Sequence, residues 1–198
     1  MSTGSSILMH MFGRPRGLLG RLGGTIMART NRRHAAWAID LLGVQQHESV
    51  LEIGFGPGIA IQLLVPKAHR IAGVDPSAVM LRQATSRNAA AIREGRVELR
   101  QGSADHLPFA NAGFDKALAV NSMQVWPEPL TGLREISRVL KVGGRLALAF
   151  TMHSGHQREG ATELVAAAGF SDCRIAETDQ AFCLLASTPS HNAPLHTE

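Results

Sequence analysis

The sequence predicts an α/β fold in which helices cover both faces of a mostly parallel sheet. Short apolar runs rich in Val, Ile and Ala alternate with longer helical stretches, which indicates parallel strands joined by helices. The last two apolar runs are separated by only two residues, a hairpin length that requires antiparallel pairing. Because the chain has 198 residues and 44% of them are apolar, one compact domain with an ordinary core is expected.

The first predicted helix spans residues 31–42, where apolar side chains recur at three- and four-residue spacing and Gly43 supplies a stop. The strands that follow are predicted at 49–53, 70–74, 96–101, 114–120 and 144–150. The helices between them are predicted near 58–65, 77–92, 129–140 and 160–168. The terminal hairpin joins 170–177 to 180–187, so the sheet should contain one reversed strand.

Three regions are expected: an N-terminal arm and helix at 1–42, the main domain at 43–188, and a loose tail at 189–198. Residues 1–33 carry six arginines, and no acidic residue occurs before Asp40. Such a basic segment could attract an anionic partner such as RNA or a membrane surface. The alternative is a solvated arm that packs over the domain.

Cysteine usage and hydropathy exclude several classes of protein. The two cysteines, Cys173 and Cys183, lie in no metal-ligand spacing, so neither a disulfide framework nor a metal site is predicted. No run of 18 apolar residues occurs, so no membrane span is predicted. Arginines interrupt the N-terminal segment before a signal-like apolar core could form. The expectation is a soluble, cytoplasmic protein.

The stretch from Val50 to Gly58 reads VLEIGFGPG, an apolar strand that ends in three glycines within five residues. A strand that enters a glycine-rich turn and then a helix is how α/β sheets bind nucleotide-like ligands. A phosphate loop would need Gly-Lys-Ser/Thr, and a dinucleotide site would need a small residue where Ile59 stands. Glu52 would also repel phosphates, so the spacing favours a cationic or zwitterionic ligand.

This segment resembles the first motif of class I S-adenosylmethionine-dependent methyltransferases, and later segments follow that family in order. RIAGVD ends a second strand in Asp75, 21 residues beyond Gly54. GSADHLPF follows the third strand, FDKALAVN resembles the fourth, and LKVGGRL resembles the turn into the fifth. The resemblance covers about residues 49–150 and implies a Rossmann-like seven-stranded sheet with S-adenosylmethionine as the cofactor.

The resemblance also implies roles for individual residues. Asp75 would accept hydrogen bonds from the ribose hydroxyls, Asp105 would accept one from the adenine amino group, and Met80 would pack on the adenine. The alternatives are that Asp75 introduces the next helix, with Ser77 as its N-cap, that Asp105 is solvated, and that Met80 belongs to the core. The expected cofactor-binding residues are Glu52, Gly54, Gly56, Gly58, Asp75, Met80, Ala104, Asp105 and Asn121.

Catalysis needs little chemistry from the protein, because a methyl group on a sulfonium is already electrophilic and alignment with the acceptor carries most of the reaction. A general base is optional. His153 is the predicted base, Asn121 is predicted to orient the acceptor, and Trp126 could form a wall of the pocket. The alternatives are a solvated histidine and ordinary loop or packing residues.

The residues after the fourth predicted strand limit the classes of methyl acceptor that are expected. The sequence NSMQ at 121–124 lacks the Asp/Asn-Pro-Pro-aromatic signature of nucleic-acid amino-methylating enzymes, and no cysteine is near for cytosine C5 methylation. A small organic acceptor is therefore expected, as in the quinone-biosynthesis C-methyltransferases that the chain resembles. Residues 7–42 are predicted to form a substrate lid, with a homodimer partner as the alternative roof. The alternative functions are a catalytically weak cofactor-binding subunit and an RNA-binding methyltransferase-like protein.

Overall fold

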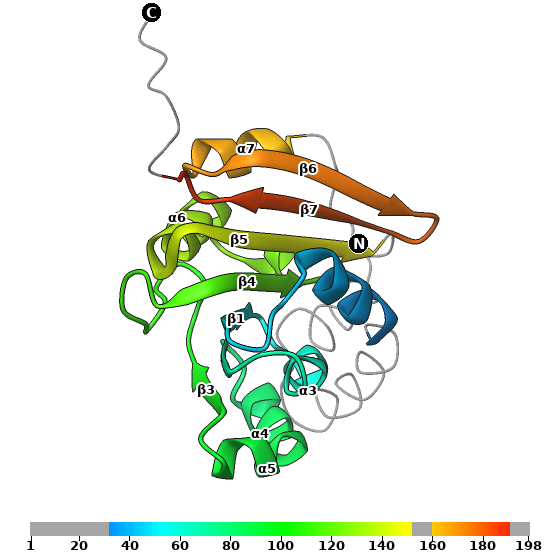
Figure 1. The fold of residues 1–198 in the computed structure, drawn as a ribbon, viewed down its shortest axis with the longest axis vertical. Coiled ribbons are helices and arrows are strands. Elements are labelled where there is room, and N and C mark those ends of the chain that lie inside the picture. The colour runs from blue at the N-terminus through cyan, green and yellow to red at the C-terminus, as the bar shows by residue number, and fades with distance from the viewer. Residues whose placement is uncertain (1–31, 152–159, 191–198) are drawn as a thin grey trace, which may run out of the picture.

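The computed structural model describes residues 32–151 and 160–190, which form a seven-stranded sheet between two layers of helices (Figure 1). The strands are β1 Ser49–Ile53, β2 Arg70–Asp75, β3 Val97–Gln101, β4 Phe114–Val120, β5 Leu140–Thr151, β6 Ser171–Thr178 and β7 Ala181–Ser187. They lie in the order β3-β2-β1-β4-β5-β7-β6. The ladders among β1 to β5 are parallel, and β7 runs antiparallel to both β5 and β6. The predicted fold class and reversed strand are confirmed.

Helices cover both faces of the sheet. They are a helix over residues 32–42, α3 Ile59–Leu64, α4 Ala78–Arg87, α5 Ala89–Arg93, the 3₁₀ turn η2 Met123–Val125, α6 Pro129–Val139 and α7 Ala161–Ala167. The helix over 32–42 shares one hydrophobic cluster with α3, α4 and α5, whereas α6 and α7 share the other. In residues 32–151 and 160–190, no helix combines the length and apolar character that crossing a bilayer would need.

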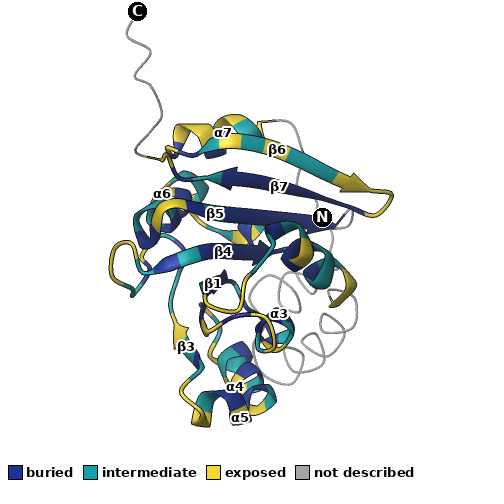
Figure 2. Cartoon of the chain, viewed as in Figure 1, coloured by how far each residue is buried: buried dark blue, intermediate teal, exposed yellow. Residues whose placement is uncertain are grey.

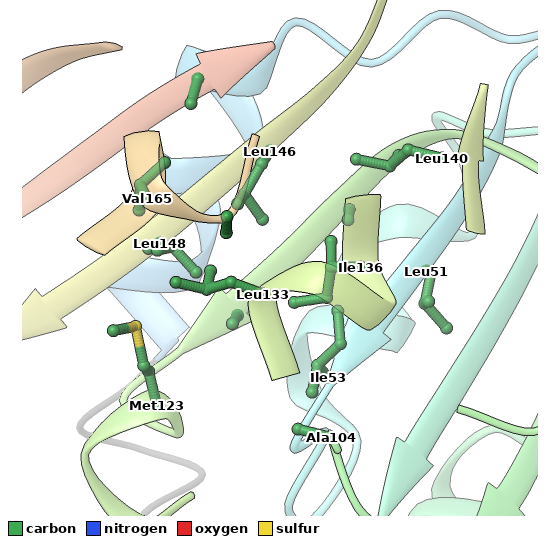
Figure 3. Close-up of a cluster of buried hydrophobic side chains, with 14 of the residues drawn as sticks. Leu51, Ile53, Ala104, Met123, Leu133, Ile136, Leu140, Leu146, Leu148 and Val165 are labelled. Carbon is green, nitrogen blue, oxygen red and sulfur yellow. The ribbon is translucent and has the colours of Figure 1, made fainter. Parts of the chain in front are cut away.

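Successive residues of the central strands supply the two clusters alternately, as expected for strands buried on both faces. In β1, Val50 belongs to the cluster with α3, and Leu51 belongs to the cluster with α6. Figure 2 shows β4, β5 and β7 buried along most of their length. Figure 3 shows Leu133 and Ile136 of α6 packed among side chains of β1 and β5. Because packed side chains fill both faces of the central sheet, a ligand site is expected at the ends of the strands.

The prediction of a single helix over 77–92 is wrong, because the helix is interrupted at Asn88, between α4 and α5. The Asn88 side-chain amide donates to the carbonyl of Ala84 at 2.9 Å and to the carbonyl of Gly58 at 3.1 Å. Asn side chains that bond to nearby carbonyls compete with regular helix. The break holds a buried polar side chain between α3 and α4.

The fifth strand begins at Leu140 and not at residue 144 as predicted. Phe114 pairs with Leu140 whereas Lys116 pairs with Arg145, so the register shifts between these two pairs. Gly143, with φ 71°, lies in the irregular segment. A bulge of this kind adds residues to one strand without shifting the pairing of the others. Residues 144–150 are therefore in the strand as predicted, although the strand begins earlier.

The helix over residues 32–42 is attached to the sheet at its C-terminal end. The buried ammonium of Lys116 donates to the carbonyls of Leu42 at 3.1 Å and Gly43 at 2.5 Å, and it pairs with Glu48 at 3.1 Å. Cations are favourable there because the last carbonyls of a helix lack partners within the helix. Lys116 therefore fixes the C-terminal end of this helix near the beginning of β4.

Candidate functional site

A cavity of about 530 Å³ opens at the carboxyl ends of the parallel strands. This is where open α/β sheets bind ligands, at the point where the strand order reverses from β2-β1 to β4-β5. The residues that line it are Ala35, 52–57, 59–60, 74–80, 101–104, 120–122 and 125–127. The turns after β1, β2, β3 and β4 thus meet in one site, as the ordered sequence segments predicted.

Asp75 ends β2 and holds two turns of the cavity together. One carboxylate oxygen accepts from the backbone N–H of Gly56 at 2.8 Å, and the other accepts from the N–H of Ser77 at 2.8 Å. Ser77 in turn caps α4 by accepting from the N–H of Met80 at 3.4 Å. Burial raises the pKa of Asp75, and the two backbone hydrogen bonds oppose that rise. The carboxylate therefore shapes the glycine turn as well as facing the cavity.

Glu52 lies in the same cavity and is only 3% exposed. Its Oε2 has no hydrogen-bond partner among the described residues, and its carboxyl accepts a backbone hydrogen bond from Ile61 in α3. Burial, and then the nearby charge of Asp75, raise the pKa of Glu52 well above its ordinary value. A cation in the cavity would offset both effects, so the site is suited to a positively charged ligand.

The three glycines after β1 have different structural roles. Gly54 has φ 73°, and a Cβ added there would lie 2.4 Å from Cβ of Ser122. Gly58 is the N-cap of α3 with φ 79°, and its added Cβ would lie 2.7 Å from Cβ of Ala84. Gly58 is not among the residues that line the cavity. Gly54 and Gly58 are therefore required by close packing, and Gly56 brings its N–H to Asp75.

The residues predicted near the adenine divide between the cavity and its surroundings. Met80 and Ala104 line the cavity and are both buried. Asp105 does not line it, although its Oδ1 is buried without a hydrogen-bond partner in the described part of the chain. The adenine role predicted for Asp105 therefore remains a prediction.

Asn121 lines the cavity at the end of β4. It adopts φ 49°, and its Oδ1 accepts from the backbone N–H of Thr151 at 2.8 Å and from the Thr151 hydroxyl at 3.3 Å. These bonds tie the ends of β4 and β5 together and fix the orientation of the amide. His153, the predicted base, and residues 1–31 with most of the arginine-rich arm lie outside the described residues.

The opposite wall of the cavity is apolar and contains Val125, Trp126 and Pro127; Trp126 was predicted as a wall of the pocket, whereas Val125 and Pro127 were not singled out. Trp126 lies against α6, where a Cβ on Gly132 would be 2.9 Å from the indole Cε3. Val125 is 39% exposed and Pro127 follows, so an apolar strip borders the cavity. On the carboxylate side, Phe55 of the turn after β1 packs against Gly73, whose added Cβ would meet the ring at 2.7 Å. No local pattern marks Val125 and Pro127 as part of the apolar wall, because apolar loop residues are compatible with many structures.

Known proteins are similar to this chain in sequence and in fold. A family model described as "Methyltransferase domain" matches residues 51–148. The uncharacterized methyltransferase YdaC of Bacillus subtilis is 34% identical over 129 residues, which cover 64% of this chain and 69% of that protein. A 2-methyl-6-phytyl-1,4-hydroquinone methyltransferase of Oryza sativa is 30% identical over 108 residues, covering 52% of this chain and 29% of that protein. A SAM-dependent methyltransferase from Aquifex aeolicus has a similar crystal structure, with a TM-score of 0.73 at 17% identity over 83% of this chain and 97% of that one.

Fold, cavity and relatives together define the class as the class I S-adenosylmethionine-dependent methyltransferases. The chain belongs to the methyltransferase domain family, and its cofactor is S-adenosylmethionine. The family, the enzyme class and the cofactor predicted from the sequence are confirmed. The cavity fits this cofactor because the buried, unpartnered Oε2 of Glu52 would gain a cationic neighbour.

Proposed function

We propose that this methyltransferase acts on a small organic acceptor, which approaches the cofactor from the side formed by residues 120–127. The observation that carries the proposal is the division of one cavity into a side with two buried carboxylates and a side bordered by apolar residues. A cavity of about 530 Å³ is of the size that binds cofactors and small molecules. The hydroquinone methyltransferase among the relatives supports an acceptor of this kind.

In this proposal, the carboxylate side binds the cofactor. Glu52 provides a buried negative charge, and Asp75 accepts hydrogen bonds from the ribose hydroxyls. Met80 and Ala104 pack on the adenine ring. S-adenosylmethionine supplies a methyl group on a positively charged sulfur, which is electrophilic without further activation. The chain's own contribution is to bind, to orient and to exclude water, and good alignment alone corresponds to effective molarities of about 10⁵ M or more.

The acceptor side lacks an evident base in the described residues. Glu52 and Asp75 are the titratable side chains among the residues that line the cavity, and both are assigned to the cofactor. Asn121 is held by Thr151 and can orient an acceptor through its amide. The acceptor therefore needs an intrinsically reactive atom or a proton acceptor from the 152–159 segment, where His153 remains the proposed candidate.

Residues 7–42 are proposed to cover the acceptor side. Ala35, from the first part of the helix over 32–42, lines the cavity and supports this proposal. Removal of residues 1–30 should raise the acceptor KM or lower kcat while the cofactor still binds. Unchanged acceptor kinetics in the truncated protein would assign the roof to another element, such as the second subunit of a dimer.

The experiment that tests the proposed function combines binding and turnover. Calorimetric titration with S-adenosylmethionine, NAD and ATP should detect binding of the first alone. Transfer of isotope-labelled methyl to a panel of hydroquinones, phenols, carboxylic acids and amines should then label an acceptor, and an Asp75→Ala variant should label it more slowly at a subsaturating cofactor concentration. Cofactor binding without transfer to any acceptor would favour the second candidate, a catalytically weak cofactor-binding subunit, which is supported by the lack of an acceptor-side base among the lining residues that the structure describes.

A further inference from the structure

Asn88, which interrupts the predicted helix, also bonds to the turn that follows β1 (the glycine turn, residues 54–58), although it does not line the cavity. It is 5% exposed, and its Nδ2 donates to the carbonyl of Gly58 at 3.1 Å. The two residues are far apart in the sequence but lie where α4 passes α3. The backbone N–H and C=O of Asn88 still bond to Ala84 and Ile92, so its side-chain amide is available to bond to Gly58 across the gap between the helices.

Arg87, the residue before it, makes a parallel contact. Its Nη1 donates to the carbonyl of Pro57. Two consecutive residues at the end of α4 thus bond to two consecutive carbonyls of the turn that follows β1. Bonds from a guanidinium to a carbonyl are stronger than neutral ones, so Arg87 holds its peptide firmly.

The beginning of α4 contacts the same turn from the other side. Asp75, just before α4, accepts from the N–H of Gly56, and Met80 in its first turn lines the cavity. Because peptide groups are planar, fixing the carbonyls of Pro57 and Gly58 also fixes the directions of the next two N–H groups. The glycine turn is therefore held between an acceptor at one end of α4 and two donors at the other.

We propose that Arg87 and Asn88 are positioning residues for the cofactor: their bonds to the carbonyls of Pro57 and Gly58 hold the glycine turn in the shape that binds S-adenosylmethionine. The inference rests on the cofactor site described above. Neither residue lines the cavity, so both act through the turn and not by direct contact. A small displacement of a binding loop changes affinity strongly, because the contacts of a preorganised site depend on its geometry.

The decisive comparison uses arginines of the same helix. Arg87→Met keeps the side-chain length and removes the donors, Arg87→Lys keeps one charged donor, and Arg82→Met is the matched control because Arg82 is exposed on α4. Loss of one charged hydrogen bond predicts a Kd for S-adenosylmethionine about 10-fold higher in Arg87→Met, with partial rescue to about threefold in Arg87→Lys. Arg82→Met should leave the Kd unchanged.

The kinetic readout separates positioning from general destabilisation. In Arg87→Met, the KM for the cofactor should rise with its Kd, while kcat at saturating cofactor and the midpoint of thermal unfolding stay close to those of the unsubstituted protein. Asn88→Ala should also raise the cofactor Kd, by about threefold, which is less than in Arg87→Met because the Gly58 carbonyl keeps the N–H of Gln62 as a donor. If that variant does not fold, the arginine comparison still decides.

Two outcomes have distinct meanings. An unchanged cofactor Kd in Arg87→Met, or a rise that Arg82→Met reproduces, would overturn the positioning role. Failure of the unsubstituted protein to bind S-adenosylmethionine would instead overturn the cofactor site on which the inference rests, so the two failures can be distinguished in one set of titrations.

Discussion

The two sides of the cavity differ in how strictly the backbone dictates their residues. On the carboxylate side, Gly54 and Gly58 have positive φ and no room for a Cβ, and Asp75 bonds to two backbone N–H groups. On the side of residues 120–127, Asn121 and Ser122 bond to the backbone of neighbouring strands, but the wall itself is made by the apolar side chains of 125–127. Substitution on the first side changes the shape of the turn, whereas substitution on the second changes mainly what the wall contacts. The first side should therefore control folding and cofactor binding, and the second should control the acceptor.

The largest effect is expected from Gly54→Ala. Its Cβ would overlap Ser122 and its φ of 73° disfavours a side chain, so the free energy of unfolding should fall by about 3 kcal/mol or more. Chemical denaturation measures it. Gly95→Ala is the matched control, because Gly95 has φ 72° and nothing within 4 Å of an added Cβ. That control should lose only the backbone term, about 1 kcal/mol. Equal losses of unfolding free energy in the two variants would mean that the contact with Ser122 contributes nothing to the destabilisation.

The second largest effect is expected on cofactor binding in Asp75→Ala. The variant loses the acceptor for the N–H groups of Gly56 and Ser77 together with any bond to the ribose. Its cofactor Kd should therefore rise by an amount equivalent to about 1–3 kcal/mol. Calorimetry measures it, and Asp75→Asn, which keeps an acceptor oxygen, should lose less. If Asp75→Ala bound the cofactor as tightly as the unsubstituted protein, the ribose site would have to lie elsewhere.

The same difference between the two sides explains what the sequence could reveal. Glu52, Gly54, Gly56 and Asp75 were predictable because strand-to-helix turns at this edge permit few residue types, and their spacing is local. Two other contacts join segments far apart in the chain, and no local pattern encodes them. They are the close approach of Gly54 to Ser122, which leaves no room for a Cβ, and the bond from Asn88 to Gly58. The helix break at Asn88 was missed for that reason.

The fold was predictable for a related reason. Strands buried on both faces are continuous apolar runs, which is why β1 and β4 were predicted with the observed bounds. The early start of β5 was not, since the exposed residues around Gly143 carry no apolar pattern and are held by pairing with β4. On the acceptor wall Trp126 was predicted but Val125 was not, because apolar loop residues of this kind are compatible with many structures.

A smaller effect, of opposite sign for stability and binding, is expected in Glu52→Gln. Burial and the charge of Asp75 raise the pKa of Glu52, so the folded protein without cofactor binds more protons than the unfolded chain between the ordinary and the raised pKa. Stability from this group is complete below the ordinary pKa and is lost as the pH rises through the raised one. Relative to the unsubstituted protein, Glu52→Gln should gain about 1 kcal/mol of stability at pH 8 and little at pH 4.

Cofactor affinity should move the other way. A cationic cofactor favours ionised Glu52, so its affinity should increase with pH in the unsubstituted protein and become weaker and less dependent on pH in Glu52→Gln, where Asp75 still titrates. Thermal unfolding and calorimetry at several pH values measure the two effects. Parallel pH profiles for the unsubstituted protein and the variant would show that Glu52 does not titrate in this range, and the account of the carboxylate side would fail.

The smallest effect on the cofactor is expected from Val125→Ser, on the apolar side. Val125 is already 39% exposed, so the free energy of unfolding should change by less than about 0.5 kcal/mol and the cofactor Kd should stay within about twofold. The acceptor KM should nevertheless rise by about threefold to tenfold, because an apolar contact at the wall is lost. Val142→Ser is the matched control, since Val142 is 58% exposed in the irregular start of β5 and does not line the cavity. A change in cofactor Kd larger than the change in acceptor KM would mean that the two sides of the cavity are not separate in function, because the apolar strip would then be contributing to the site of the cofactor itself.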